Sequence, residues 1–281
     1  MTLEELKTAL PKPDALTPAE IEAKAEGLGE AKTSMSFTQS FVLSIMAGAF
    51  IAMGAMFFCL VVGDSDLPFA VQRVLGGVLF SMGLLLVVVC GAELFTGNTM
   101  IVMTAASGKI TWGAVLKNWL IVFFGNFVGA LIIVALVFLC GTHAMNGGVV
   151  GETMVSVAAG KMTPDWVTLF ARGIMCNFLV CLGVWIAYAS KTVADKMLGI
   201  LLPIAAFVAC GFEHCVANMF FLPMGILLAG MGIAPAGLDP GTLSFAGALW
   251  NWSATVPGNI VGGALFVGMA YWLVYRKKNT K

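Results

Sequence analysis

The stretch ACGFEHCVANMFF, residues 209–221, decides the fold because it interrupts a long apolar segment with polar side chains. Glu213, His214 and Asn218 follow one another closely there, and hydrophobic residues flank them on both sides. A second stretch, GAELFTGN (residues 91–98), has glycine, glutamate and asparagine at the same relative positions. The two stretches predict two helices that are broken at matching points.

Composition indicates which solvent surrounds the chain. Of its 281 residues, 59% are hydrophobic and only 11% are charged, whereas a soluble domain has about 25% charged residues. We therefore expect an all-α integral membrane protein surrounded by a lipid bilayer. The net charge of zero argues against nucleic acid as a partner. The seven cysteines form no CxxC pair, so we expect buried thiols and neither a metal site nor a disulfide framework.

Six segments are long and apolar enough to span a membrane, which takes about 20 residues. They are roughly residues 41–62, 71–104, 112–140, 167–190, 197–231 and 245–275. The second and fifth are too long for one straight helix and too short for two. We expect both to be broken at the polar stretches described above.

An internal repeat predicts how the six spans are arranged. NWLIVFFGNFVGALI begins at Asn118 and NWSATVPGNIVGGAL begins at Asn251, so the third and sixth spans match as the second and fifth do. Because each repeat has an odd number of spans, the second must be inverted in the membrane, and its broken helix meets the first near the midplane. Interrupted backbone is tolerated there only where it lines a cavity or is buried in protein. The architecture favours a channel or carrier for a small solute over a structural membrane protein with kinked helices.

Charge predicts the orientation, because cytoplasmic loops carry an excess of lysine and arginine. With the N-terminus inside, Lys109, Lys117, Lys191, Lys196, Arg276, Lys277, Lys278 and Lys281 lie on the inner side, against Arg73, Lys161 and Arg172 on the outer side. We therefore expect both termini to be cytoplasmic.

The chain divides into a polar segment (residues 1–36), a six-span part (37–275) and a basic cytoplasmic tail (276–281). The first segment has no apolar core of the signal-peptide type, so we expect no cleaved export signal. It contains TPAEIEAKAEGLGEAK, which predicts a short amphipathic cytoplasmic helix with Thr17 as N-cap, Pro18 at the first position and Glu20 completing a capping box.

His214 is one of only two histidines, and it lies within the fifth span. An ionisable residue inside a membrane marks a solute or proton pathway by default, and histidine changes its charge most easily near neutral pH. The alternative is a neutral ring that only hydrogen-bonds the broken backbone. We favour a role in the pore.

Five further polar residues each have two interpretations. Glu93 and Glu213 either carry protons or accept hydrogen bonds from freed backbone N–H groups, and we favour this structural role because an anion pathway disfavours two bare carboxylates. Asn177 and Asn259 either bond the interrupted loops or face the solute. Lys161 either extends to the membrane interface or attracts anions.

Four stretches together resemble the formate/nitrite transporter family: GAELFTGNT, CNFLVCLGVW, GFEHCVANMFFLPMG and GNIVGGALFVGMAYW. The resemblance covers all six predicted spans. It implies an aquaporin-like fold and a homopentamer with one pore in each protomer. The implied protein is a channel rather than an enzyme, needs no cofactor, and passes small monovalent anions such as formate, nitrite and hydrosulfide across a prokaryotic cytoplasmic (inner) membrane.

The resemblance also implies residue roles. The equivalent of His214 is the central histidine of the pore, and that of Thr96 is hydrogen-bonded to it from the first broken loop. The equivalents of Asn177 and Asn259 are polar residues of the pore lining, and that of Lys161 lies near the outer vestibule.

Two apolar constrictions are implied as well. The equivalents of Leu84 and Leu94 form the constriction on the cytoplasmic side, and those of Phe80 and Phe207 form the periplasmic one. The N-terminal helix is similar to one that can plug or gate the cytoplasmic mouth.

The substrate stays open between branches of the family. Formate channels tend to carry a small hydroxyl residue where Gly97 stands, and nitrite channels tend to carry glycine followed by histidine. This chain has Gly97 followed by Asn98. We favour formate, with a nitrite or hydrosulfide channel as the first alternative and a pore for neutral solutes such as water or glycerol as the second. Channel conduction and anion–proton symport both fit the sequence.

Overall fold

The structure is a computed structural model that describes residues 15–63 and 66–276, and every regular element within them is helical. In chain order these are α2 (Pro18–Ser34), α3 (Phe37–Val62), α4 (Phe69–Cys90), α5 (Phe95–Asn98), η1 (Thr99–Ile101), α6 (Val102–Ala106), α7 (Trp112–Leu139), η2 (Thr142–Ala144), η3 (Asn146–Gly148), α8 (Val149–Met162), α9 (Trp166–Ala189), α10 (Val193–Ala209), α11 (Cys215–Gly230), η4 (Pro240–Thr242), α12 (Phe245–Ile260), η5 (Val261–Met269) and α13 (Ala270–Tyr275). The predicted all-α class is confirmed for these residues.

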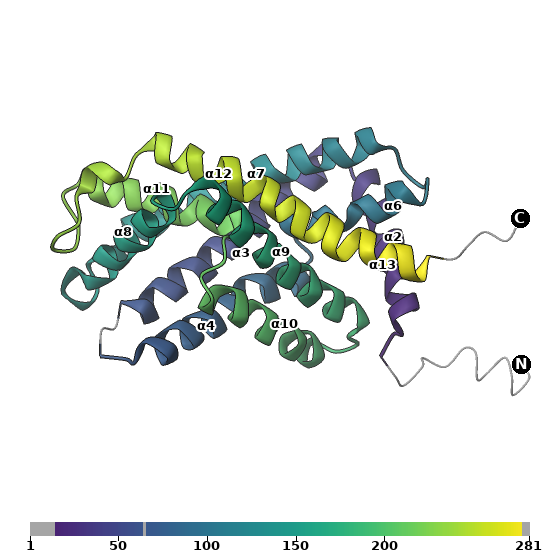
Figure 1. Cartoon of the computed structure of the whole chain (residues 1–281), viewed down its shortest axis with the longest axis horizontal. Coiled ribbons are helices and arrows are strands. Elements are labelled where there is room, and N and C mark those ends of the chain that lie inside the picture. The colour runs from purple at the N-terminus through teal and green to yellow at the C-terminus, as the bar shows by residue number, and fades with distance from the viewer. Residues whose placement is uncertain (1–14, 64–65, 277–281) are drawn as a thin grey trace, which may run out of the picture.

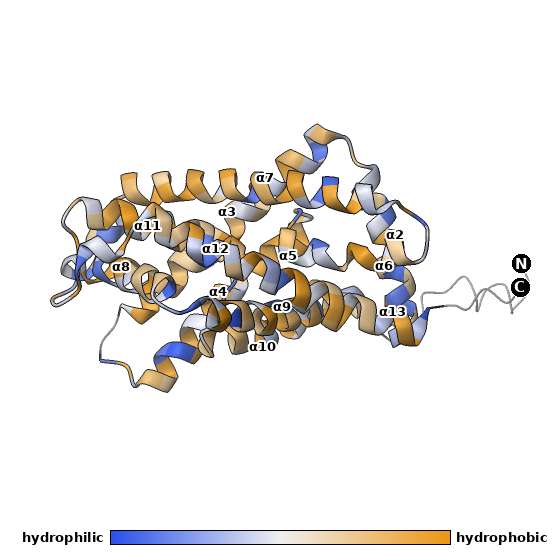
Figure 2. Cartoon of the chain, turned by 45° about the horizontal axis from the view of Figure 1, so that its top comes forward, coloured by the Kyte–Doolittle hydropathy of each residue, from blue (hydrophilic) through white to orange (hydrophobic). Residues whose placement is uncertain are grey.

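The molecule is an elongated helical bundle, with α8 near one end and α2 and α13 near the other (Figure 1). Five helical stretches in the described residues are long and apolar enough to cross a membrane: α3, α4, α7, α9 and the continuous stretch Phe245–Tyr275. Hydrophobic residues run along most of α7 in Figure 2. The bundle has the length and apolar surface that a lipid environment requires.

Both predicted breaks are present. Helix α4 ends at Cys90 and α5 starts at Phe95; helix α10 ends at Ala209 and α11 starts at Cys215. Gly91 and Gly211 each follow the first half-helix with a left-handed backbone, φ +78° and +73°. Glycine adopts this conformation without a steric penalty, which explains why each break begins with it.

Several elements were not predicted. Helix α8 occupies residues that were expected to be a loop before the fourth span, and it packs on α11. The last long helix contains the π-helical stretch η5, in which glycines allow close approach to α9. The expectation that all seven cysteines are buried was wrong, because Cys90, Cys140 and Cys210 are exposed.

Helix α2 lies across one end of the bundle. The predicted capping box is confirmed: Glu20 N donates to Thr17 Oγ1, and Glu20 Oε2 accepts from Thr17 N at 2.9 Å. The helix is attached to the bundle by Lys24 Nζ, which donates to Tyr188 O at 2.7 Å, and by Thr104 Oγ1, which donates to Glu26 O at 3.1 Å. The other predicted parts of the two tails, residues 1–14 and 277–281, lie outside the described residues.

Candidate functional site

His214 stands at the N-terminus of α11, at the end of the second break, and is buried. Its Nδ1 accepts a hydrogen bond from Ala217 N at 3.0 Å. Because a backbone N–H can only donate, Nδ1 carries no proton, and the proton of the neutral ring is on Nε2. Nε2 lies 3.0 Å from Thr96 Oγ1, so it is the donor of that hydrogen bond.

Thr96 comes from the first break, so this hydrogen bond joins the two interrupted segments. Its carbonyl oxygen accepts from Asn177 Nδ2 at 3.1 Å and from Thr99 Oγ1 at 2.7 Å. These contacts fix the backbone that carries the Thr96 hydroxyl. The pairing of His214 with Thr96 that the resemblance implied is present in the structure.

Two cavities lie near this pair. The first, about 330 Å³, opens toward α8 and is lined by Phe80, Phe207 and His214 among others. The Phe80 and Phe207 rings meet edge to face at 5.7 Å between centroids, and Phe207 stacks on His214 at 5.8 Å. We call it the α8-side cavity.

The second cavity, about 240 Å³, opens toward α2 and is lined by Leu84 and Leu94, together with Lys32 and Tyr188. Both leucines are buried. We call it the α2-side cavity. The two aromatic residues and the two leucines assigned from the resemblance to opposite constrictions thus border different cavities, and His214 borders the first.

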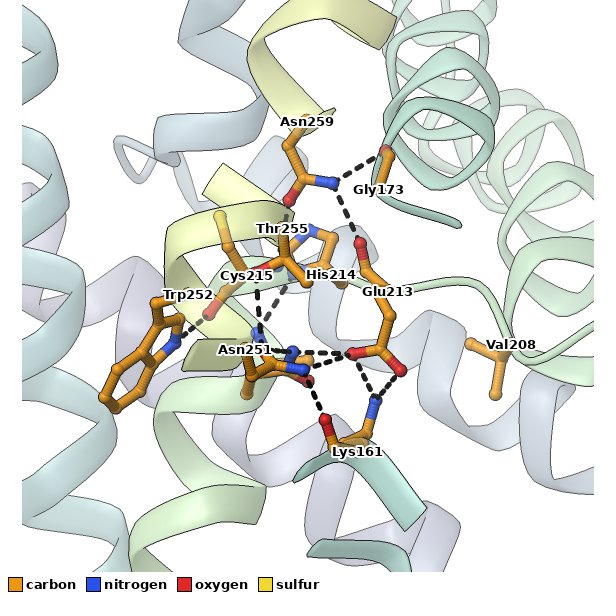
Figure 3. Close-up of polar contacts among 12 residues, drawn as sticks. Lys161, Gly173, Val208, Glu213, His214, Cys215, Asn251, Trp252, Thr255 and Asn259 are labelled. Carbon is orange, nitrogen blue, oxygen red and sulfur yellow. Dashed lines mark hydrogen bonds and ion pairs between the residues drawn. The ribbon is translucent and has the colours of Figure 1, made fainter. Parts of the chain in front are cut away.

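Glu213 has a dense set of partners (Figure 3). Its carboxylate accepts two hydrogen bonds from Lys161 Nζ at 3.1 and 3.2 Å, one from Asn218 Nδ2 at 2.7 Å and one from Asn251 Nδ2 at 3.3 Å. Lys161 also lies over the Phe221 ring, 5.2 Å from its centroid. A buried carboxylate needs such a counter-charge to offset the cost of leaving water.

Glu93 has matching partners at the first break. Its carboxylate accepts from Lys32 Nζ at 2.6 Å and from Asn98 Nδ2 at 2.7 Å. Asn98 in turn donates to Asn118 Oδ1, as Asn218 does to Asn251 Oδ1. The expectation that Glu93 and Glu213 accept from freed backbone N–H groups was wrong, since their partners are lysine and asparagine side chains.

Two asparagines satisfy the freed backbone instead. Asn126 Oδ1 accepts from Phe95 N, and its Nδ2 donates to Ser44 O and Glu93 O.

The second break has the same arrangement. Asn259 Oδ1 accepts from Cys215 N at 2.8 Å, and its Nδ2 donates to Gly173 O and Glu213 O at 2.8 Å each (Figure 3). The oxygen and the nitrogen of the Asn259 side-chain amide therefore both bond to protein backbone. Asn177 is likewise buried and donates to Thr96 O and Asn259 O.

Sequence reasoning did not single out Lys32. It placed Asn126 and Asn251 in the internal repeat but did not predict their hydrogen bonds at the breaks. The internal repeat could have predicted Lys32. Because Glu93 and Glu213 occupy equivalent positions, the lysine that pairs with Glu213 implies that a cation also pairs with Glu93. That cation comes from α2, which lies outside the repeated unit. No group of three or more histidine, cysteine, aspartate or glutamate residues in the described ranges is arranged to hold a metal ion.

The model of the formate/nitrite transporter family matches residues 19–273. This chain belongs to the formate/nitrite transporter family. The formate channel FocA of Escherichia coli (strain K12) is 40% identical over 277 residues, which is 95% of this chain and 96% of that one. FocA of Haemophilus influenzae (strain ATCC 51907 / DSM 11121 / KW20 / Rd) is 38% identical, over 91% of this chain and 93% of its own.

A solved structure of a pentameric formate channel with formate bound has the same fold as this member of the family. Its TM-score is 0.79 at 40% identity, and the match covers 86% of this chain and 98% of that one. The resemblance seen in the four sequence stretches is thereby confirmed. The named relatives are channels, which agrees with membrane transport rather than catalysis.

Proposed function

We propose that this protein is a channel for small monovalent anions, with formate as its main substrate. The observation that carries the proposal is the His214–Thr96 hydrogen bond, which joins the two helix breaks in a buried position beside the Phe80–Phe207 contact. The relatives named as formate channels support the choice of formate.

We further propose six spans in two inverted three-helix repeats, in an aquaporin-like arrangement. The matched contacts of Asn126 and Asn259, and of Glu93 and Glu213, support this arrangement. We assign both termini to the cytoplasm of a bacterial inner membrane. The α2 mouth then faces the cytoplasm and the α8 mouth the periplasm, with residues 37–275 as the channel part.

The protein acts as a homopentamer in which each protomer contains its own pore. The solved pentameric relative supports this assembly. The presence of Lys32 on the wall of the α2-side cavity supports a position of α2 beside the cytoplasmic mouth, where α2 regulates access.

The anion crosses two apolar constrictions, Phe80–Phe207 and Leu84–Leu94. Removing the water of hydration from a bare charge there costs a large free energy. Between them, His214 Nε2–H and the Thr96 hydroxyl supply hydrogen-bond donors. The proton comes from solvent: His214 takes it up as an imidazolium, gives it to a weak-acid anion and returns to the neutral ring. The substrate then crosses the second constriction as a neutral acid. Asn177 and Asn259 act on the pore by holding the broken loops that line it.

Replacement of His214 by asparagine tests this proposal. Asparagine can still accept from Ala217 N as an N-cap, so the break is preserved while the titratable ring is lost. We expect formate uptake into proteoliposomes to lose its pH dependence. The matched control is His143→Asn in η2, which should leave that dependence unchanged. Retention of the full pH dependence in His214→Asn would show that the proton step is wrong.

A pore for neutral solutes is the rival function on the same fold, because a neutral histidine donor suits water or glycerol. The two are separated by comparing osmotic water flux with formate-dependent current in the same proteoliposomes. Water flux without formate current would exclude anion conduction. Competition by nitrite, hydrosulfide, acetate and lactate then ranks the anions.

A further inference from the structure

The α8-side cavity contains more positive than negative charge. The ionised residues on its wall are Arg73, Lys161, Arg172 and Glu213. Lys161 is neutralised by its ion pair with Glu213 at 3.1 Å. The two arginines therefore leave this mouth of the pore with an excess of positive charge.

Arg172 is the unpaired cation of this cavity. It lies near the start of α9 and is half-buried, and its guanidinium forms no hydrogen bond or ion pair with any residue in 15–63 or 66–276. Its backbone carbonyl accepts from Glu213 N at 3.2 Å, so its position is fixed against the second break. A partly desolvated guanidinium without a partner favours an anionic ligand.

Arg73 flanks the same break from α4. Its Nε donates to Ala209 O at 3.1 Å and its Nη2 donates to Val208 O at 2.7 Å. These are the last carbonyls of α10, at the negative end of that half-helix. Arg73 thus offsets a partial charge that would repel an anion approaching Phe207, and its Nη1 forms no hydrogen bond with another described residue.

Both arginines reach the cavity beside the residues between α10 and His214. Gly211 illustrates the proximity, because a Cβ on it would lie 3.4 Å from Arg73 Nη2. The wall also includes Phe58 and Phe221, and the Arg73 guanidinium lies over the Phe58 ring, 5.6 Å from its centroid. An anion that enters from this mouth therefore meets guanidinium groups before it reaches the Phe80–Phe207 contact.

We propose that Arg172 and Arg73 form an anion-binding subsite at the periplasmic mouth that captures small carboxylates before the aromatic constriction. Arg172 supplies a free planar fork for the carboxylate, and Arg73 supplies fixed positive charge beside it. The subsite rests on the proposed anion conduction and adds a loading step to it. Arg172 is its binding residue, and Arg73 also positions the end of α10.

The test compares wild type with Arg172→Gln and Arg172→Lys in right-side-out and inverted membrane vesicles, measuring initial formate flux against formate concentration. Loss of one charge-assisted contact is expected to raise the half-saturating formate concentration about tenfold from the periplasmic side. The maximum rate should stay within about twofold of wild type. Arg172→Lys keeps the charge but loses the planar fork, so its half-saturating concentration should lie between those of wild type and Arg172→Gln.

Lys191→Gln is the matched control, since it removes an exposed cation between α9 and α10 that does not line the α8-side cavity. It should leave the periplasmic half-saturation unchanged. Equal elution of all variants as one oligomer shows that they are folded. A wild type without formate flux would overturn the anion function itself.

The subsite is overturned separately if wild type conducts formate and Arg172→Gln keeps the same half-saturating concentration. It is also overturned if Arg172→Gln lowers only the maximum rate, because that change indicates a structural effect. If Arg172→Gln fails to assemble, Arg172→Lys decides, because a wild-type half-saturating concentration in Arg172→Lys would overturn binding through the guanidinium fork.

Discussion

Asn126 and Asn259 show at the residue scale how a broken helix is kept intact inside a bilayer. Each accepts from the first N–H of a half-helix and donates to two carbonyls of neighbouring segments. One side chain thereby satisfies an N–H and a carbonyl that the break frees and that lipid cannot satisfy, and it ties them to a neighbouring helix. The breaks depend on these asparagines as much as on the glycines that begin them.

We therefore expect Asn259→Ala to be strongly destabilising. It removes the partner of two groups of the break, the Cys215 N–H and the Glu213 carbonyl, and each unpaired buried group costs about 1–3 kcal/mol. The measurement is thermal unfolding of the purified protein in detergent. Ser253→Ala on the same helix is the control, because the exposed Ser253 hydroxyl bonds only to Trp250 O. Equal melting temperatures for the two variants would contradict the role of Asn259.

At the scale of elements, α2 is held to the bundle by charged groups that titrate. Burial, followed by the neighbouring Glu26 carboxyl, raises the pKa of Glu22 from 4.5 to about 7. Burial also disfavours ionisation of Glu26, but the Lys109 ammonium and the Ser107 hydroxyl hold the pKa of Glu26 below its ordinary value. The docked helix thus carries one protonated and one ionised carboxyl at mildly acidic pH.

This difference predicts that docking of α2 weakens as the pH rises. The docked state binds the Glu22 proton more tightly than the undocked state, so its advantage is complete below pH 4.5 and is lost as the pH rises through about 7. Hydrogen exchange of α2, expressed as protection relative to intrinsic rates, should decrease over that range. Glu22→Gln should remove the decrease, whereas Glu30→Gln, at an exposed site of the same helix, should not.

At the scale of the whole molecule, the exposed apolar surface determines the surroundings of the protein. Large hydrophobic side chains such as Leu120, Phe124 and Leu136 are exposed along α7, and Leu265 and Phe266 along η5. Such a surface is stable against lipid or against other protomers. The proposed pentamer divides it between those two environments.

Native mass spectrometry from mild detergent tests this assembly. We expect a single species at five times the chain mass of 29.5 kDa. Formate flux should persist when the oligomer is crosslinked, because each protomer has its own pore. A monomer that conducts at the wild-type rate would contradict a functional requirement for the pentamer.

The sequence by itself determined the membrane class and the positions of the breaks, and it singled out His214 as the candidate pore residue. Charge content, segment length and polar residues inside apolar runs can be read directly from the sequence. Exposing apolar surface to water and burying polar groups in lipid both cost free energy, so these features leave few possible folds. The first, third, fourth and sixth predicted segments agree closely with α3, α7, α9 and the stretch Phe245–Tyr275.

Only the tertiary structure decided which groups meet across the chain. Lys32 reaches Glu93 and Arg73 reaches the end of α10 through contacts between residues far apart in sequence. Nothing in the local pattern reveals that the lysine of α2 neutralises a carboxylate in the first break, or that Arg172 is left unpaired in the α8-side cavity. The sequence alone determined where polar groups interrupt the membrane spans, because that depends on local composition. Packing determined which partners satisfy those groups, because the partners come from distant parts of the chain.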